Sequence, residues 1–208
     1  MRKKGFIRKL VVFCVWFVAL HRFAAAQDWE NKGREMMDVR TLLVDPANPQ
    51  VMYAGTGRGV FRSENAGQDW RNVLQVKGDK RAVNMLAFAL QGKNSIYAAT
   101  GSGLFLSLDS GARWRRIFKG RNYSESDCSC ILINDESIYL GTGGGLFFRR
   151  DKGVSWQKEK GRLGKERILS VAAAMGEGGY LYVASNEGAY RKKRLQDDWE
   201  RVYVARSS

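Results

Sequence analysis

Four copies of one sequence pattern fill most of this chain, and this internal repeat restricts its fold more than any other feature. Each copy begins with tyrosine, passes through small and glycine residues to a second aromatic residue, and ends in tryptophan. The intervals between the four tryptophans are 44, 42 and 43 residues. A period near 40 residues is typical of propellers and solenoids built from stacked units. The copies occupy residues 53–70, 97–114, 139–156 and 182–199.

Each unit is predicted to form four short antiparallel strands. In the first unit these strands cover residues 39–44, 51–55, 60–63 and 70–74, and turn-forming residues separate them. A small sheet cannot bury both of its apolar faces alone, so the units must stack around a common axis. We therefore expect an all-β fold, a β-propeller of four blades, either as an open or partial ring or as a closed one. The blades are expected at about residues 39–73, 81–118, 127–160 and 167–204.

The segment before each tryptophan resembles the Asp-box, or BNR repeat, with the pattern Ser-x-Asp-x-Gly-x-x-Trp. In such a turn Asp or Asn accepts backbone N–H groups, Gly takes a positive φ, and Trp packs on the hairpin. We interpret the matching residues as structural, because single carboxylates on separate blades do not converge on one calcium ion. They are Ser63, Asn65, Gly67 and Trp70 in the first unit, Ser107, Asp109, Gly111 and Trp114 in the second, Asp151, Gly153 and Trp156 in the third, and Trp199 in the fourth.

The first 26 residues are predicted to be a cleaved signal peptide. A basic stretch precedes eleven apolar residues at 10–20, and Ala24, Ala25 and Ala26 supply a cleavage site. The alternative, a membrane anchor, would need roughly 20 apolar residues. Cleavage after Ala26 leaves a propeller domain at residues 27–208 that is secreted or periplasmic, and contact with the membrane is then limited to the transient signal peptide.

Basic residues gather in the segments that are expected to join one blade to the next. Without residues 1–26 the formal net charge falls from +14 to +8, and the segments 75–81, 119–127 and 157–167 hold ten basic and five acidic residues. Propeller geometry places these segments on one face together with the loop at Arg58. We hypothesise a partner-binding basic face; the alternative is an ordinary solvated surface. Its candidate residues are Arg58, Lys77, Lys80, Arg81, Lys119, Arg121, Arg162, Lys165 and Arg167.

Several classes of chemistry are excluded by residue type. His21 is the only histidine and lies in the predicted signal peptide, so Ser-His-Asp or Cys-His catalysis and His-based metal sites cannot form downstream. The glycine-rich segments at 55–59 and 141–145 are expected to join strands without a following helix, and we interpret them as tight turns. We expect no metal and no cofactor. An exported chain also makes nucleic acid an unsuitable partner.

Two cysteines remain outside the predicted signal peptide. Cys128 and Cys130 are two residues apart and are expected on one face of a strand, where they cannot lie opposite each other. We interpret them as small packed apolar residues and not as a disulfide.

Glycoside hydrolysis is the enzymatic alternative, because some Asp-box propellers are sialidases or xyloglucanases. The Arg-Ile-Pro motif of sialidases is missing here, since both prolines lie in the segment 45–49. Glu125, Asp127 and Glu187 are candidate carboxylates, but nothing in the sequence identifies a catalytic pair. We therefore expect no catalysis, with a degenerate glycosidase-like propeller as the alternative.

The blade pattern is most similar to the propellers of sortilin-type receptors and photosystem II assembly factors, with a wider likeness to WD40 and YVTN repeats. That resemblance implies recognition of proteins or peptides, and an anionic glycan is the other partner that the charge suits. Residues 28–32 resemble the fourth-strand segments and imply a spare outer strand. A closed four-blade ring, a homodimeric ring and a segment of a longer propeller all remain open.

Overall fold

The structure is a computed structural model, and the residues that it describes belong to one compact unit, Gly33–Ser208. The predicted signal peptide, the segment 28–32, and Asp151 and Gly153 lie outside the described residues. The described ranges are 38–89, 94–134, 137–150, 155–174, 179–193 and 198–204.

Four antiparallel sheets of four strands each follow one another along the chain, as the repeat predicts. We call them blades 1 to 4. Blade 1 holds β1 (Val39–Val44), β2 (Met52–Thr56), β3 (Gly59–Ser63) and β4 (Arg71–Leu74), and blade 2 holds β5 (Val83–Phe88), β6 (Ile96–Thr100), β7 (Gly103–Ser107) and β8 (Arg115–Phe118). Blade 3 holds β9 (Cys128–Ile133), β10 (Ser137–Thr142), β11 (Gly145–Arg150) and β12 (Gln157–Lys158), and blade 4 holds β13 (Ile168–Ala173), β14 (Tyr180–Ser185), β15 (Gly188–Lys193) and β16 (Glu200–Val204).

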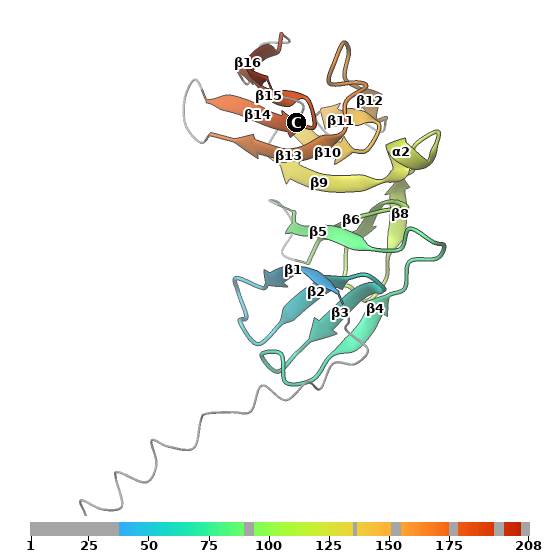
Figure 1. The fold of residues 1–208 in the computed structure, drawn as a ribbon. Coiled ribbons are helices and arrows are strands. Elements are labelled where there is room, and N and C mark those ends of the chain that lie inside the picture. Colours follow the sequence, from blue (N-terminus) through green and yellow to red (C-terminus); the bar gives the residue numbers. More distant parts are fainter. Residues whose placement is uncertain are drawn as a thin grey trace, which may run out of the picture. The chain divides into compact units, whose positions relative to one another are not determined.

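The blades stack in chain order through their first strands (Figure 1). Strand β1 contacts β5, β5 contacts β9, and β9 contacts β13, so the first strand of each blade is the inner strand. Within each blade the strands pair in sequence order, and the fourth strand lies at the outer edge. This arrangement is that of a partial β-propeller of four blades.

Three apolar clusters fill the three junctions between neighbouring blades. Tyr53 and Val60 of blade 1 pack with Leu86 of blade 2, and equivalent side chains form the clusters at the next two junctions. Fully buried residues such as Leu104 and Leu140 come from the second and third strands of the blades. Burial of apolar surface between sheets is therefore what holds the repeat together.

A β-bulge near the start of every inner strand changes which face its first residue occupies. The pairing register shifts between Val39 and Thr41 in β1, and at the equivalent points of β5, β9 and β13. In β9 the bulge turns Cys128 into the cluster shared with blade 2, whereas Cys130 packs in the cluster shared with blade 4. The expectation that both cysteines lie on one face is wrong, because the extra residue, Ser129, breaks the alternation of a regular strand. Both thiols are free and buried.

One helical turn interrupts the all-β pattern. The four residues of α2 (Tyr123–Ser126) lie in the segment between β8 and β9, and the Asn122 side chain accepts a hydrogen bond from the Glu125 backbone N–H at its start. No helical periodicity marks this segment in the sequence, because a single turn is too short to show one. Within the described part of the chain, no helix has the length and apolar character to cross a membrane.

The junction clusters make a stability prediction from two leucines of blade 2. Leu104 is fully buried, whereas Leu108, in the turn after β7, is 59% exposed. Leu104→Ala should lower the free energy of unfolding by about 2–5 kcal/mol, because it removes buried methyl groups and leaves a cavity. Leu108→Ala should change it by less than about 0.5 kcal/mol. Urea denaturation of both variants measures this difference, and equal effects would contradict the assignment of the core.

Candidate functional site

The turns between the third and fourth strands of blades 1 and 2 have the same hydrogen-bonded structure. The hydroxyl of Ser63 accepts the backbone N–H of Gly67 at 2.9 Å, and Ser107 does the same for Gly111 at 2.8 Å. Both glycines have a positive φ, 86° and 85°. Such φ values favour glycine, so each turn needs the residue that it has.

The Asp or Asn of each turn holds the backbone in the same way. Asn65 Oδ1 accepts the Asp69 N–H at 2.9 Å, and Asp109 Oδ1 accepts the Arg113 N–H at 2.8 Å. Asp109 also forms an ion pair with the Arg113 guanidinium at 2.7 Å, and this side-chain hydrogen bond lowers the pKa of Asp109 to about 2. Its carboxylate is therefore engaged inside its own turn.

The four tryptophans of the repeat donate hydrogen bonds to two different kinds of acceptor. Trp70 and Trp114 donate their indole N–H to Gly67 and Gly111 of their own turns, at 2.9 and 3.0 Å. Trp156 and Trp199 instead donate to the preceding blade, to the carbonyl of Ile117 at 3.2 Å and to Glu159 Oε2 at 3.1 Å. The two units whose sequence departs most from the turn pattern therefore use tryptophan to join blades.

The segments that join the blades lie beside the turns between the second and third strands, all at one face of the molecule. Backbone N–H groups of Gly101 and Gly143, in the β6–β7 and β10–β11 turns, donate to the carbonyls of Ala82 and Asp127 at 3.0 and 2.9 Å. The Asn186 N–H likewise donates to the Arg167 carbonyl at 3.0 Å. Each joining segment is thus fixed by its backbone, while its long side chains extend from it. We call this surface, residues 57–58, 75–82, 119–127 and 159–167, the basic loop face.

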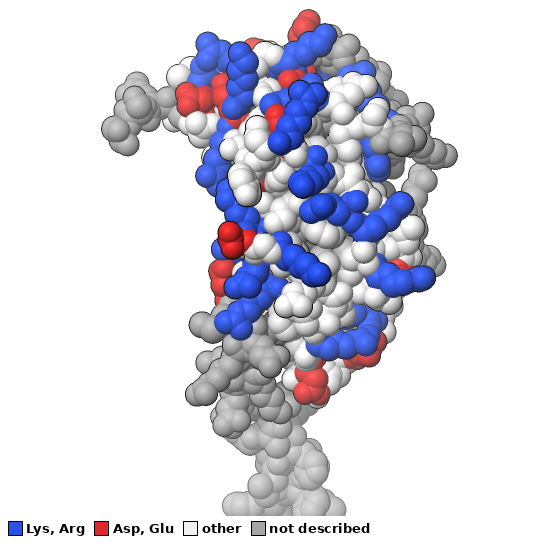
Figure 2. All heavy atoms as spheres, turned by 90° about the vertical axis from the view of Figure 1, so that its right-hand side faces the viewer, with Lys and Arg blue, Asp and Glu red and all other residues white. Residues whose placement is uncertain are grey.

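All nine basic residues expected on this face are exposed there. Lys80 comes within 3.7 Å of Asp127, and the Arg121 backbone N–H donates to Glu125 at 2.9 Å. The other side chains make no hydrogen bond or ion pair among the described residues. Figure 2 views the molecule from the side where α2 and the β4–β5 segment lie in Figure 1, and Lys and Arg side chains spread across it while acidic ones lie mainly near its margins.

Acidic residues of the same segments are largely occupied by structural contacts. Glu125 Oε1 accepts a hydrogen bond from Lys158 at 2.7 Å, and this contact lowers the pKa of Glu125. Glu166 accepts hydrogen bonds from the hydroxyls of Ser185 and Tyr190 at 2.7 and 2.8 Å. Glu125 and Glu166 are therefore held within the fold, whereas Asp79 is exposed, and most of the positive charges remain available at the surface.

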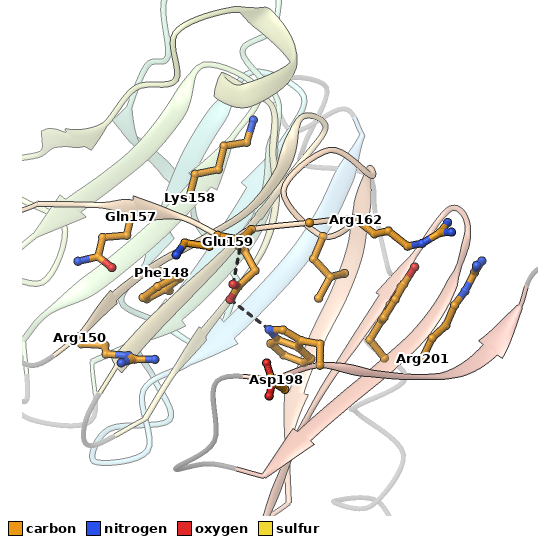
Figure 3. A pocket seen from close by; sticks show the side chains of 13 residues that line it. Phe148, Arg150, Gln157, Lys158, Glu159, Arg162, Asp198 and Arg201 are labelled. Carbon is orange, nitrogen blue, oxygen red and sulfur yellow. Dashed lines mark hydrogen bonds between the residues drawn. The ribbon is translucent and has the colours of Figure 1, made fainter.

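A cavity of about 690 Å³ opens between blades 3 and 4 at the outer end of this face (Figure 3). Figure 3 shows Arg162 and Arg201 on one side of it and Arg150 and Gln157 on the other, with Glu159 reaching toward the indole of Trp199. The lining combines aromatic rings with mostly basic groups. It comprises Phe148, Arg150, Gln157, Lys158, Glu159, Lys160, Gly161, Arg162, Leu163, Tyr190, Asp198, Trp199 and Arg201.

The sequence predicts Arg162 as a binding residue and Trp199 as a structural one, but it does not reveal the cavity that they share. The cavity borders β12, the outer strand of blade 3, which has only two residues. One signal was present in the sequence: the third residue after tryptophan is Val73, Ile117 and Val202 in three units, but Glu159 in the third unit. A charged residue at an otherwise apolar position indicates that the strand is not packed there in the usual way.

Neither ionisable clusters nor reactive thiols mark a catalytic centre in the described residues. No three His, Cys, Asp or Glu side chains of this part of the chain gather closely enough to hold a metal ion. Burial raises the pKa of both the Cys128 and the Cys130 thiol. Such thiols are poor nucleophiles, because the thiolate is the reactive form.

Sequence comparison gives no match to any protein-family model or curated protein. Structure comparison finds β-propellers. An ancestral GH74 enzyme aligns with a TM-score of 0.65 at 18% identity, over 79% of this chain and 25% of its own. The extracellular domain of BT4673 from B. thetaiotaomicron aligns with 0.64 at 15%, over 85% and 23%. YCF48 bound to D1 peptide aligns with 0.56 at 18%, over 79% and 55%.

These similarities establish the fold, since all three identities are below 20%. The chain spans between about a quarter and about half of the length of these proteins. They are an enzyme, an extracellular domain and a peptide-bound protein, so a shared propeller does not by itself assign an activity.

The ion pair of Asp109 gives a pH prediction. Because its folded-state pKa is lowered to about 2, its stabilising contribution is present above the ordinary carboxyl range and is lost as pH falls toward 2. An NMR titration should place the Asp109 midpoint near pH 2, and Arg113→Ala should raise it toward the ordinary value. Arg115→Ala, two residues further along the chain at the start of β8, is the control and should leave it unchanged. A wild-type midpoint in the ordinary range would contradict the ion pair.

Proposed function

We propose that this chain is a non-catalytic, exported β-propeller module that binds an acidic stretch of a partner protein on the basic loop face. The single observation that carries the proposal is the imbalance of free charge. Exposed Lys and Arg side chains of the joining segments are mostly without partners, whereas Glu125 and Glu166 are engaged in the fold. A surface of this kind raises the local concentration of anionic ligands and accelerates their association.

A polypeptide is favoured over an anionic glycan as the ligand. YCF48, one of the proteins with a similar fold, has been solved bound to a peptide. The cavity between blades 3 and 4 also offers aromatic side chains, Phe148, Tyr190 and Trp199, beside Arg162 and Arg201. Aromatic and arginine side chains are the usual anchors of protein interfaces. An anionic glycan would be attracted by the same basic side chains, so the binding test compares both ligands.

The Asp-box assignment is part of the same proposal. The support is local geometry: Ser107, Asp109 and Gly111 each occupy the role in the turn that the pattern requires, and blade 1 repeats it with Asn65. Export is supported by the N-terminal sequence and by the extracellular domain among the proteins of similar fold. Because its repeat pattern resembles theirs, we place the chain with sortilin-type and photosystem II assembly propellers, which bind polypeptides.

The glycosidase alternative receives less support from the electrostatics. A glycosidase needs one carboxyl whose pKa is raised, so that it can act as a general acid. The pKa shifts resolved for carboxyls in the described residues, at Glu64, Asp109 and Glu125, are all downward. Among the candidates, Glu125 is held by Lys158, and Asp127 lies 3.7 Å from Lys80.

Charge reversal of the β12–β13 segment tests the proposal. The variant Arg162→Glu, Lys165→Glu, Arg167→Glu should bind a fluorescent 12-residue Asp/Glu-rich peptide about tenfold or more weakly than the unmodified chain, because three unpaired cations are replaced by repelling charges. Fluorescence anisotropy measures the dissociation constant. Binding by the unmodified chain should also weaken as salt rises from about 50 to 300 mM.

A matched control changes the same charge at the opposite ends of the strands. Arg71→Glu, Arg115→Glu, Lys193→Glu alters exposed residues away from the basic loop face and should retain most of the affinity. Equal losses in both triple variants would show that only net charge matters and would contradict a specific face. Preference for a sulfated oligosaccharide over the peptide would replace the polypeptide with a glycan as the ligand.

A further inference from the structure

On the face turned away from blade 2, blade 1 exposes apolar residues whose equivalents in the other blades are buried. Val39, Leu42 and Val44 of β1 are 46%, 57% and 46% exposed. By strand pairing they are equivalent to Val83, Leu86 and Phe88 of β5, which pack in the junction between blades 1 and 2. Val83 and Leu86 are only 0% and 4% exposed. Blade 1 therefore keeps the apolar surface of a junction that has no neighbour among the described residues.

Blade 4 shows the complementary surface. Its repeat tyrosine, Tyr182, is 41% exposed, although Tyr53, Tyr97 and Tyr139 at the equivalent position are 1%, 7% and 3% exposed. Tyr203 of β16 is 62% exposed, whereas the equivalent Leu74 is 9% exposed. These residues belong to the face that blades 1 to 3 pack against the next blade.

Hydrogen bonds between the inner strands also lead from each blade to the next and stop at blade 4. At each junction the bulge residue contacts the next blade: Arg40 donates to Asn84 at 2.9 Å, Asn84 to the Cys128 carbonyl at 2.8 Å, and Ser129 to the Ile168 carbonyl at 2.6 Å. The equivalent residue of blade 4 is Leu169, which is apolar and 51% exposed. A polar side chain is thus replaced by an apolar one at the position that would meet the first residue of a following blade.

We propose that the occupant of these two end faces is a second copy of this chain. The face of blade 4 in one copy packs on the face of blade 1 in the other, so that Leu169 meets Val39 of the second copy. The same kind of junction already occurs three times within each chain, and each chain exposes one copy of both of its halves. Figure 1 shows blades 1 and 4, which carry these two faces, at the opposite ends of the series of blades.

Two-fold symmetry then forms both missing junctions at once and gives a closed ring of eight blades. Eight lies within the usual range for propellers, about four to eight blades, whereas three copies would exceed it. Closure also removes both exposed apolar faces from water, which supplies the driving force for association.

Sedimentation velocity over a dilution series tests the ring. The unmodified chain should sediment at twice the mass of the 23.5 kDa chain, or of its shorter cleaved form. Leu42→Glu on blade 1 and Tyr203→Glu on blade 4 should each raise the dimer dissociation constant by about 100-fold, because each places a charge in both junctions. Val44→Glu and Leu169→Glu are second variants of the same two faces and should act alike. Circular dichroism confirms that each variant keeps its sheet content.

Leu108→Glu and Tyr123→Glu are the matched controls. Leu108 and Tyr123 are 59% and 83% exposed, but they lie in the turn after β7 and in α2, away from both end faces. Both variants should remain dimers. A monomer at every concentration of the unmodified chain would overturn the proposal, as would a polymer longer than two copies. Sensitivity to changes on only one of the two faces would overturn it as well, because the ring uses both.

Discussion

The structure depends on burial of apolar surface between successive sheets. A four-stranded sheet whose strands have two to six residues has two faces and too few side chains to form a core alone. Here Tyr53, Tyr97 and Tyr139 each fill the junction with the following blade, and leucine, valine and phenylalanine side chains come from the other side. The strand pairs provide the frame, but the junctions provide the free energy that keeps four similar sheets in one unit.

The sequence was sufficient to predict the sheets, because their landmarks repeat. Tyrosine, glycine and tryptophan each occupy a turn or junction whose geometry requires them, so their spacing determines the strand order. The β-bulges could not be predicted in this way. A rule of strict alternation placed Cys128 and Cys130 on one face, and only the pairing of β9 with β10 shows the inserted Ser129 that separates them. The bulge shifts the pairing register by one residue, and neither composition nor the spacing of the repeat reveals such a shift.

The candidate site was predicted in part for the same reason. The topology of a meander fixes which loops share a face, and the charges of those loops can be counted, so the basic loop face followed from sequence. The cavity between blades 3 and 4 did not, since it depends on how early β12 ends and on the bond from Trp199 to Glu159. Contacts between a side chain of one unit and a side chain of the next cannot be derived from the pattern of either unit alone.

Cys128 and Cys130 of β9 offer a way to measure how the junctions of this propeller open. Their thiols are free and shielded, and they face different neighbours: Cys128 the second blade and Cys130 the fourth. A thiol in such a position reacts with an alkylating reagent only when its own junction opens. The two thiols therefore report on the two junctions that flank β9. Fast alkylation of Cys128 alone would indicate that blades 1 and 2 detach, and fast alkylation of Cys130 alone would indicate that blade 4 detaches.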